Sequence, residues 1–275
     1  MPIVPRDFEA TILENRPVGG YFRLLLEDRL GSLKGSLPGQ FINLRIQPGL
    51  SPLLRRPFSI ARLLPHKGRS LRMEVLYAVH KQGTRLLAHK RPGETVGVLG
   101  PLGNPFPHMD KHQTALLVGG GIGVAPLVFL AEHLKRLKAP FAVFLGARTG
   151  SDLLDIDVFK DLGCPLFLAT DDGSRGRKGF VTDLLDDYLS SPKAAKESLI
   201  HACGPRPMFK SVTRVSFKHG VKAFLSWEEH MACGLGICLT CTCPVGDEES
   251  YRMERTCTEG PVFEASRIRW EKIGS

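Results

Sequence analysis

The sequence TALLVGGGIGVAP at residues 114–126 joins an apolar run to a glycine-rich turn. The apolar run at 115–118 predicts a buried strand, and apolar residues at helical spacing over 126–138 predict a helix after the turn. A glycine-rich turn between a strand and a helix lets backbone amides approach a pyrophosphate. The motif is weak by itself, because a tight turn in any α/β unit explains it as well.

Further buried runs follow this turn at 141–145, 166–169 and 199–203. Strands that alternate with helical segments are typical of a doubly wound parallel sheet. The last run ends in Cys203-Gly204-Pro205. Because ligands bind at the carboxyl ends of such strands, this segment and the glycine-rich turn are expected at one nucleotide site.

The first hundred residues have a different pattern. Residues 71–79 alternate apolar and polar side chains, and shorter alternating runs at 42–46 and 96–98 follow Pro-Gly pairs. Short alternating strands separated by such turns predict an antiparallel barrel or sandwich. The proline-rich residues 101–107 predict a loop or linker. The chain is thus expected to comprise a barrel domain at 1–107, an α/β domain at 108–225 and a cysteine-rich region at 226–275.

Composition narrows the class of protein. Of 275 residues 43% are hydrophobic and 24% are charged, which is typical of a folded soluble protein. The net charge of +9 is scattered along the chain, so nucleic-acid binding is not expected. The longest uncharged stretch, 113–131, is interrupted by four glycines and a proline, which disfavours a membrane span. The N-terminal residues lack the apolar segment of an export signal, so a cytoplasmic protein is expected.

The strongest chemical signal is a set of four cysteines, Cys233, Cys238, Cys241 and Cys257. Their C-x4-C-x2-C spacing with a distant fourth cysteine is that of plant-type ferredoxins, which bind a [2Fe–2S] cluster. Glycines at 234 and 236 give the loop the freedom to wrap around a cluster. A structural zinc site is the alternative, although zinc sites usually show two C-x2-C-like pairs. Cys243 is expected to point away from the other four.

A third motif is Arg55-Arg56-Pro57-Phe58-Ser59 in the barrel half. Arginines before a proline-constrained turn suit a phosphate. Gly83-Thr84 precedes a helix-like segment at 85–89 and suits a second phosphate contact. Turn chemistry explains both segments equally well.

Together the three motifs resemble the ferredoxin reductase family of flavoproteins, and within it the electron-transfer subunits of two-component (class 1B) dihydroorotate dehydrogenases. The resemblance spans essentially the whole chain. Its specific segments are LLRRPFSIA (53–61), VLGPLGNPF (98–106), LLVGGGIGVAPL (116–127), DDGSRGRKGFVTD (171–183), CGPRPM (203–208), MACGLGICLTCTC (231–243) and CTEGPVF (257–263).

The resemblance implies three cofactor sites and no catalytic residue apart from the redox cofactors. The residues expected to line FAD are Arg56, Pro57, Phe58, Ser59, Leu76, Tyr77, Ala78, Gly83 and Thr84. Those expected at NAD(H) are Gly120, Gly121, Gly123 and, near the nicotinamide, Cys203. Those expected to ligate the [2Fe–2S] cluster are Cys233, Cys238, Cys241 and Cys257. Two departures from the family pattern are Phe58 in place of a common Tyr and Ala78 in place of a common Arg.

The implied function is electron transfer between NAD(H), FAD and the cluster. It would couple dihydroorotate oxidation in a partner FMN-containing catalytic subunit to NAD⁺ reduction in pyrimidine biosynthesis, in a heterotetramer with two copies of each subunit. One alternative is the small subunit of a ferredoxin:NADP or sulfide dehydrogenase oxidoreductase, some of which carry Asp in place of Cys233. An alternative of another class is a non-catalytic zinc-binding interaction module, which would be colourless.

Overall fold

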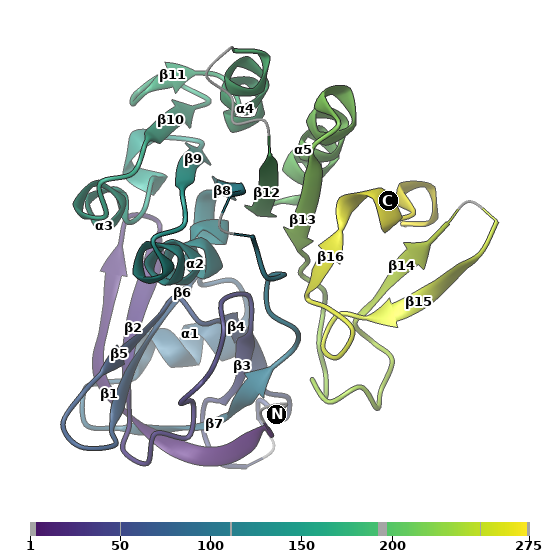
Figure 1. Cartoon of the computed structure of the whole chain (residues 1–275). Helices are drawn as coiled ribbons and strands as arrows, with labels where there is room; N and C mark the ends of the chain where they lie inside the picture. The colour runs from purple at the N-terminus through teal and green to yellow at the C-terminus, as the bar shows by residue number, and fades with distance from the viewer. Residues whose placement is uncertain (1–3, 50, 111, 192–196, 248, 274–275) are drawn as a thin grey trace.

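The computed structural model describes residues 4–49, 51–110, 112–191, 197–247 and 249–273. Figure 1 shows three parts: a curled antiparallel sheet at the bottom, a sheet flanked by helices above it, and a smaller C-terminal lobe beside them. None of the described helices is long and apolar enough to cross a membrane.

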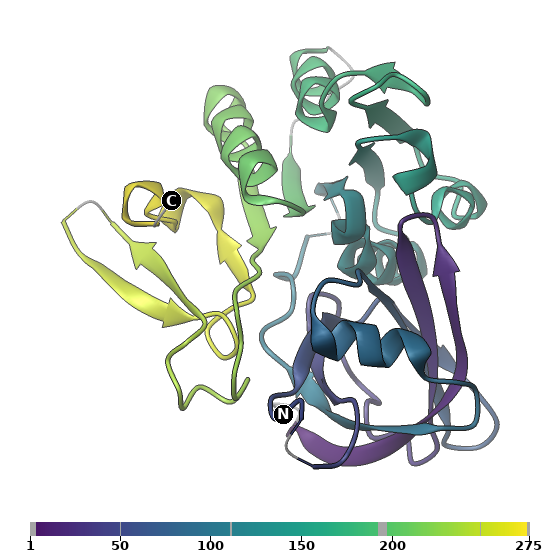
Figure 2. The same cartoon turned by 180° about the vertical axis from the view of Figure 1, so that it is seen from behind.

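The N-terminal part is an antiparallel sheet, as the alternating runs predicted. Its strands in spatial order are β4 (Arg56–Ser59), β3 (Phe41–Arg45), β7 (Thr95–Leu102), β1 (Arg6–Val18), β2 (Tyr21–Asp28), β6 (Leu71–Tyr77) and β5 (Arg62–Pro65). The sheet curls so that β4 packs against β6. Helix α1 (Gln82–His89) lies across it in Figure 2 and contributes Leu87 to the barrel core.

The proline-rich segment differs from its prediction at one end. Strand β7 continues to Leu102, and the loop begins only at Gly103. Phe41 pairs with Leu102 and Asn43 with Leu99, so the register shifts between these pairs. That irregularity accommodates Pro101, which has no N–H to donate to the ladder.

The middle part is the predicted doubly wound α/β domain. Its sheet has the spatial order β11 (Arg177–Lys178), β10 (Leu166–Thr170), β9 (Phe141–Ala147), β8 (Thr114–Gly120), β12 (Ser198–Cys203), β13 (Lys222–Ser226) and β16 (Val262–Glu264). All neighbours are parallel except β16, which is antiparallel to β13. The helices are α2 (Val124–Leu137), α3 (Ile156–Asp161), α4 (Val181–Ser190) and α5 (Arg206–His219). Helices α2 and α3 contribute to one apolar core cluster, and α4 and α5 contribute to a second. The two clusters together cover both faces of the sheet.

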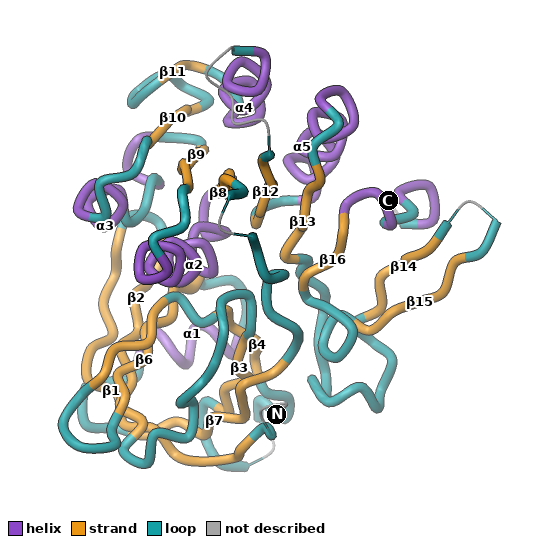
Figure 3. The backbone as a smooth tube through the Cα atoms, viewed as in Figure 1, coloured by secondary structure: helices purple, strands orange, loops and turns teal. Residues whose placement is uncertain are grey.

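The C-terminal lobe, expected only as a cysteine-rich region, contains a hairpin that the sequence did not predict. A long loop follows β13 (Figure 3), and three of the cysteines, Cys233, Cys238 and Cys241, fall within it in the sequence. Strands β14 (Thr242–Gly246) and β15 (Tyr251–Arg255) then pair as antiparallel neighbours. This hairpin is difficult to predict from the sequence, because each strand has only five residues. Strand β14 also contains a proline and ends at a glycine, and both residues are unfavourable in strands.

A buried group of charges joins the barrel to the α/β domain. Arg23 of β2 donates a hydrogen bond to Asp155, which precedes α3, and lies 3.1 Å from a carboxylate oxygen of Glu74 on β6. Burial would lower the pKa of Arg23, but Asp155 and Glu74 outweigh it and raise that pKa. A second cross-domain ion pair joins Arg62 of β5 to Glu132 of α2 at 2.6 Å. Both pairs fix how the two domains face each other.

Candidate functional site

A cleft of about 660 Å³ lies between the barrel and the carboxyl edge of the parallel sheet. The α/β domain lines it with the turn Gly120–Gly123 and with Gly204-Pro205. The barrel lines it with Tyr21 and Ala78. The glycine-rich turn and the Cys203-Gly204-Pro205 segment therefore meet at one site, as expected for the carboxyl ends of strands in a parallel sheet.

Gly123 is required by the packing of this turn. A Cβ at Gly123 would collide with the carbonyl of Cys203 and lie 2.7 Å from the backbone nitrogen of Gly204. Gly121 has φ +53°, a left-handed conformation that favours glycine. The bare backbone of the turn thus lets strands β8 and β12 end side by side and leaves the cleft open.

Cys203 lies at the end of β12, next to the cleft-lining Gly204, and its side chain is fully buried. Burial and, to a lesser degree, Glu228 raise the pKa of Cys203, whereas a hydrogen bond with Ser226 lowers it. The net pKa is well above the ordinary range, so the group is a neutral thiol at physiological pH.

Several cleft residues were not identified from the sequence as site residues. Tyr21 comes from a barrel strand, and its hydroxyl bonds with the backbone of Ile122 in the glycine-rich turn. Burial, followed by the nearby Asp152 carboxylate, raises the pKa of Tyr21. Asp171 and Glu228 also line the cleft. The DDGS segment signalled Asp171, but no local pattern marks Tyr21, because only the packing of two domains brings it to the turn.

The predicted phosphate residues of the barrel meet at the start of α1. A Cβ at Gly83 would lie 2.8 Å from the guanidinium carbon of Arg56, so the two residues touch. No side chain caps the N-terminus of α1, and its first turn has no acidic residue. A cation beside free helix amides attracts a phosphate group. Thr84 uses its hydroxyl within the turn, where it accepts a hydrogen bond from the His80 amide at 2.9 Å.

Three consecutive residues that were expected to line FAD, Leu76, Tyr77 and Ala78, do not all direct their side chains into the cleft. The Tyr77 ring is buried in the barrel core, and its hydroxyl donates to the side-chain oxygen of Asn15 at 2.9 Å. Phe58 packs edge-on against it with ring centroids 5.8 Å apart. Strand alternation therefore leaves Ala78 at the cleft, and Tyr77 has only its backbone to offer a ligand.

The predicted cluster cysteines lie against the barrel. Cys241 and Cys257 are buried and pack with Phe41 of β3 and Leu102 of β7. Burial and then the neighbouring Cys241 thiol raise the pKa of Cys257 to about 12. Cys233 is half-buried, and its charge makes a smaller contribution to raising the pKa of Cys257. Cys241 and Cys257 thus form the buried pair of the set.

Cys238 is the exposed member of the set. Hydrogen bonds from Thr240 and then from the Cys233 backbone lower the pKa of Cys238 to about 6. No three His, Cys, Asp or Glu side chains in the part of the chain that the structure describes lie close enough to share a single metal ion. A [2Fe–2S] cluster distributes four thiolates over two irons, so its ligands span a wider site.

The loop that carries these cysteines has the backbone that a cluster requires. Gly234 and Gly236 have φ of +70° and +80°, and a Cβ at Gly234 would collide with the side-chain amide of Asn43. The amide of Leu235 donates to the Cys233 sulfur at 3.3 Å, and the Gly236 backbone bonds with the Cys257 sulfur. Backbone amides directed at sulfurs suit the negative charge of a thiolate-bound cluster. The donor set and the loop geometry fit the group.

Cys243 lies apart from this set, as expected, in the apolar cluster that contains Trp227 and Val245. On a single strand Cys241 and Cys243 would share a face, because residues two apart point to the same side. The separation arises because β14 begins at Thr242, so Cys241 belongs to the preceding loop.

Comparison with known proteins agrees with this geometry. The family model of the iron-sulfur cluster binding domain of dihydroorotate dehydrogenase B matches residues 228–269, and that of the oxidoreductase NAD-binding domain matches 117–214. The dihydroorotate dehydrogenase B (NAD(+)) electron transfer subunit of Geobacillus sp. (strain WCH70) is 38% identical over 94% of this chain and 97% of its own. That of Bacillus cereus (strain B4264) is 39% identical over 84% and 86%.

Solved structures share the fold. A structure of the NADH-dependent reduced ferredoxin-NADP oxidoreductase has a TM-score of 0.82 at 30% identity and covers 96% of this chain and 90% of its own. A ferredoxin NADP+ reductase from Neisseria gonorrhoeae, at 15% identity and a TM-score of 0.64, shares the fold alone over 78% of this chain and 92% of its own. Identity near 40% over most of both chains establishes the closer relationship: the chain belongs to the family of dihydroorotate dehydrogenase B electron transfer subunits.

Proposed function

We propose that this chain passes electrons between NAD(H), FAD and a [2Fe–2S] cluster, and so couples dihydroorotate oxidation in a partner subunit to NAD⁺ reduction in pyrimidine biosynthesis. The observation that carries the proposal is the packing of Cys241 and Cys257 against β3 and β7, because β3 pairs directly with β4, the strand Arg56–Ser59 that is expected to line FAD. When bound, FAD exchanges electron pairs with a nicotinamide and single electrons with an iron–sulfur centre.

Each proposed domain contributes one site. Residues 1–107 would hold FAD, with Arg56 and the N-terminus of α1 on its phosphates and the backbone of β4 and β6 along its ring. Residues 108–225 would hold the nicotinamide nucleotide, with Gly120, Gly121 and Gly123 near the pyrophosphate. Residues 226–275 would hold the cluster through Cys233, Cys238, Cys241 and Cys257. Cys203 would keep its neutral thiol near the nicotinamide, where it adds no charge to the site.

The surface around the exposed thiol supports docking of a partner. Leu235, Ile237 and Leu239 flank Cys238 and are 45%, 78% and 62% exposed. Large apolar side chains gathered on a surface mark sites of protein interaction. We propose that they dock the FMN-containing catalytic subunit, in a cytoplasmic heterotetramer with two copies of each subunit.

The test uses the complex of the full chain with its catalytic subunit, co-purified anaerobically from the native organism. Dihydroorotate and NAD⁺ should yield NADH and orotate in equal amounts, with one proton released. The Ile237→Asp variant should lose the partner, and with it this reaction, while NADH still reduces its FAD. Absence of NADH formation by a complex that reduces an artificial acceptor with dihydroorotate would contradict the proposal.

A second candidate function is supported by the NADH-dependent reduced ferredoxin-NADP oxidoreductase, at 30% identity. In this reading the partner would exchange electrons with ferredoxin and NADP(H) instead of dihydroorotate. The higher identity of the dihydroorotate dehydrogenase relatives and the cysteine at position 233 favour the first function. Co-purification separates the two, since the second predicts a partner that does not oxidise dihydroorotate.

A further inference from the structure

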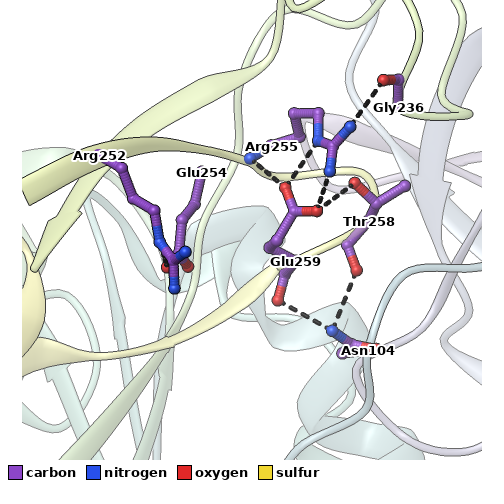
Figure 4. A network of polar contacts seen from close by, with 7 residues as sticks. All are labelled: Asn104, Gly236, Arg252, Glu254, Arg255, Thr258 and Glu259. Atoms are coloured by element: carbon purple, nitrogen blue, oxygen red, sulfur yellow. Dashed lines mark hydrogen bonds and ion pairs between the residues drawn. The ribbon is translucent and has the colours of Figure 1, made fainter.

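An ion pair joins the two ends of the turn that carries Cys257. The guanidinium of Arg255, at the end of β15, donates to both carboxylate oxygens of Glu259, with the Nε to Oε2 distance at 2.8 Å. The backbone N–H of Arg255 donates to the same Oε2 at 2.7 Å. Three donors from one residue therefore hold the Glu259 carboxylate (Figure 4).

The remaining arm of the guanidinium reaches the loop that carries the other cysteines. Arg255 Nη1 donates to the carbonyl of Gly236 at 3.0 Å, midway between Cys233 and Cys238. Thr258 donates to Glu259 at 3.1 Å and packs so closely on Gly236 that a Cβ there would lie 2.9 Å from the Thr258 methyl. The pair thus fastens the three-cysteine loop to the Cys257 turn.

The same turn is also tied to the barrel. Asn104, which follows β7, donates its side-chain amide to the carbonyls of Thr258 and Glu259 at 3.0 and 2.9 Å (Figure 4). Its backbone N–H donates to the carbonyl of Gly260 at 2.7 Å. The barrel, the Cys257 turn and the loop at 233–241 are therefore joined in one network of hydrogen bonds.

Arg255 also places a positive charge close to the buried thiols. Glu259 is the main group that raises the pKa of Arg255, and Cys257 and Cys241 raise it further. A fixed cation near a cluster stabilises the more negative, reduced form. Such charges and the hydrogen bonds around a cluster set its reduction potential.

We propose that Arg255 is a positioning residue for the iron–sulfur cluster. It holds the 233–241 loop against the Cys257 turn through Gly236 and Glu259, and its charge raises the reduction potential of the cluster. This inference rests on the proposed function, because it takes Cys233, Cys238, Cys241 and Cys257 as the ligands.

The test compares Arg255→Gln, Arg255→Lys and Glu259→Gln with a matched control, Arg252→Gln. Arg252 lies on the same strand and pairs with Glu254 at 3.3 Å, but its side chain is 80% exposed and makes no described hydrogen bond to the cysteine loop (Figure 4). Each full-length chain is loaded anaerobically with iron, sulfide and FAD. The readouts are an EPR-monitored redox titration of the cluster and the rate of iron release to a chelator.

We expect Arg255→Gln to lower the cluster's midpoint potential and to speed iron release about ten-fold, the size of effect typical of groups that orient metal ligands. Arg255→Lys keeps the positive charge but loses the guanidinium donors to Glu259 and Gly236. It should therefore release iron faster, while the midpoint potential of the cluster stays nearly unchanged. Glu259→Gln removes the ion pair with Arg255 but keeps the arginine cation. It should therefore also release iron faster, without lowering the midpoint potential of the cluster. Arg252→Gln should match the parent chain.

A parent-like potential and release rate in Arg255→Gln would overturn the inference while leaving the proposed function intact. If Arg255→Gln does not fold, Arg255→Lys and Glu259→Gln decide the positioning role, and parent-like iron release in both would overturn it. Failure of the parent chain to bind iron at all would instead contradict the proposed function.

Discussion

Replacing Arg23 with Met should uncouple the barrel from the α/β domain. Arg23 is 16% exposed, whereas the carboxylates that it pairs with, Glu74 and Asp155, are 7% and 2% exposed. Met keeps the apolar stem of the side chain but removes the charge. Two buried carboxylates would then lie near each other with no cation between them.

The expected cost follows from what remains buried. Removing one member of a buried ion pair destabilises a protein by about 3–5 kcal/mol, chiefly because the partner charge is left uncompensated. The slight exposure of Arg23 and the nearby Arg62 place the loss at the lower end, about 3 kcal/mol. The surface pair of Arg16 with Glu14 provides the control, and Arg16→Met should change stability by less than about 0.5 kcal/mol.

The loss should depend on pH in a defined direction. Burial already raises the pKa of Glu74, although Arg23 opposes the rise. Without Arg23 this pKa rises further, so the folded protein takes up a proton at a pH where the unfolded chain does not. Stability of Arg23→Met relative to the parent therefore increases as the pH falls from 7 towards 5.

Urea unfolding at pH 7 and pH 5 measures both effects. The triple variant Arg23→Met, Glu74→Gln, Asp155→Asn leaves no buried charge in the group and should recover most of the loss at pH 7. A loss below about 1 kcal/mol in Arg23→Met, or a loss that the triple variant does not recover, would refute the buried-charge reasoning.

Three further predictions concern single sites. Gly123→Ala should weaken NADH binding and lower stability, since its Cβ would collide with the Cys203 carbonyl; calorimetric titration and urea unfolding measure this. His201 is fully buried with its pKa lowered to about 3, so stability should fall by about 1.4 kcal/mol per pH unit below 6.5 from this group. His201→Leu should therefore lose less stability than the parent between pH 7 and pH 5. Cys238→Ser should lose iron and keep FAD, whereas Cys164→Ser should keep both, as metal analysis and flavin absorbance will show.

Local patterns predicted much of this molecule. The apolar runs and the glycine-rich turn predicted strands β8, β9, β10 and β12 of the α/β domain, and the helix expected at 126–138 is found at 124–137. These predictions succeed because a strand buried on both faces is a continuous apolar run, whereas a helix that packs on one face has apolar residues at helical spacing. The cysteine spacing predicted an iron–sulfur loop because its ligands are close together in sequence.

Features that depend on distant segments could not be predicted. Tyr21 reaches the glycine-rich turn from a barrel strand, and Arg23 meets Asp155 across 132 residues. The hairpin β14–β15 lacks a strong alternating pattern, so its pairing depends on the lobe around it. The side-chain hydroxyl of Tyr77 likewise meets Asn15 of β1, 62 residues earlier in the chain, and the contact of Tyr77 with the flavin stays a prediction.

The route of the chain through the C-terminal lobe has a consequence for how such a protein can be built. The segment leaves the parallel sheet at Ser226 and returns at Val262, and these two residues are paired neighbours on adjacent strands. The lobe therefore joins the sheet through one pair of neighbouring residues, while its Trp227 and Val245 also belong to an apolar core cluster of the α/β domain. Deleting the lobe would therefore keep the strand order of the sheet up to β13 but would expose the apolar surfaces that the lobe covers on the α/β domain and on the barrel.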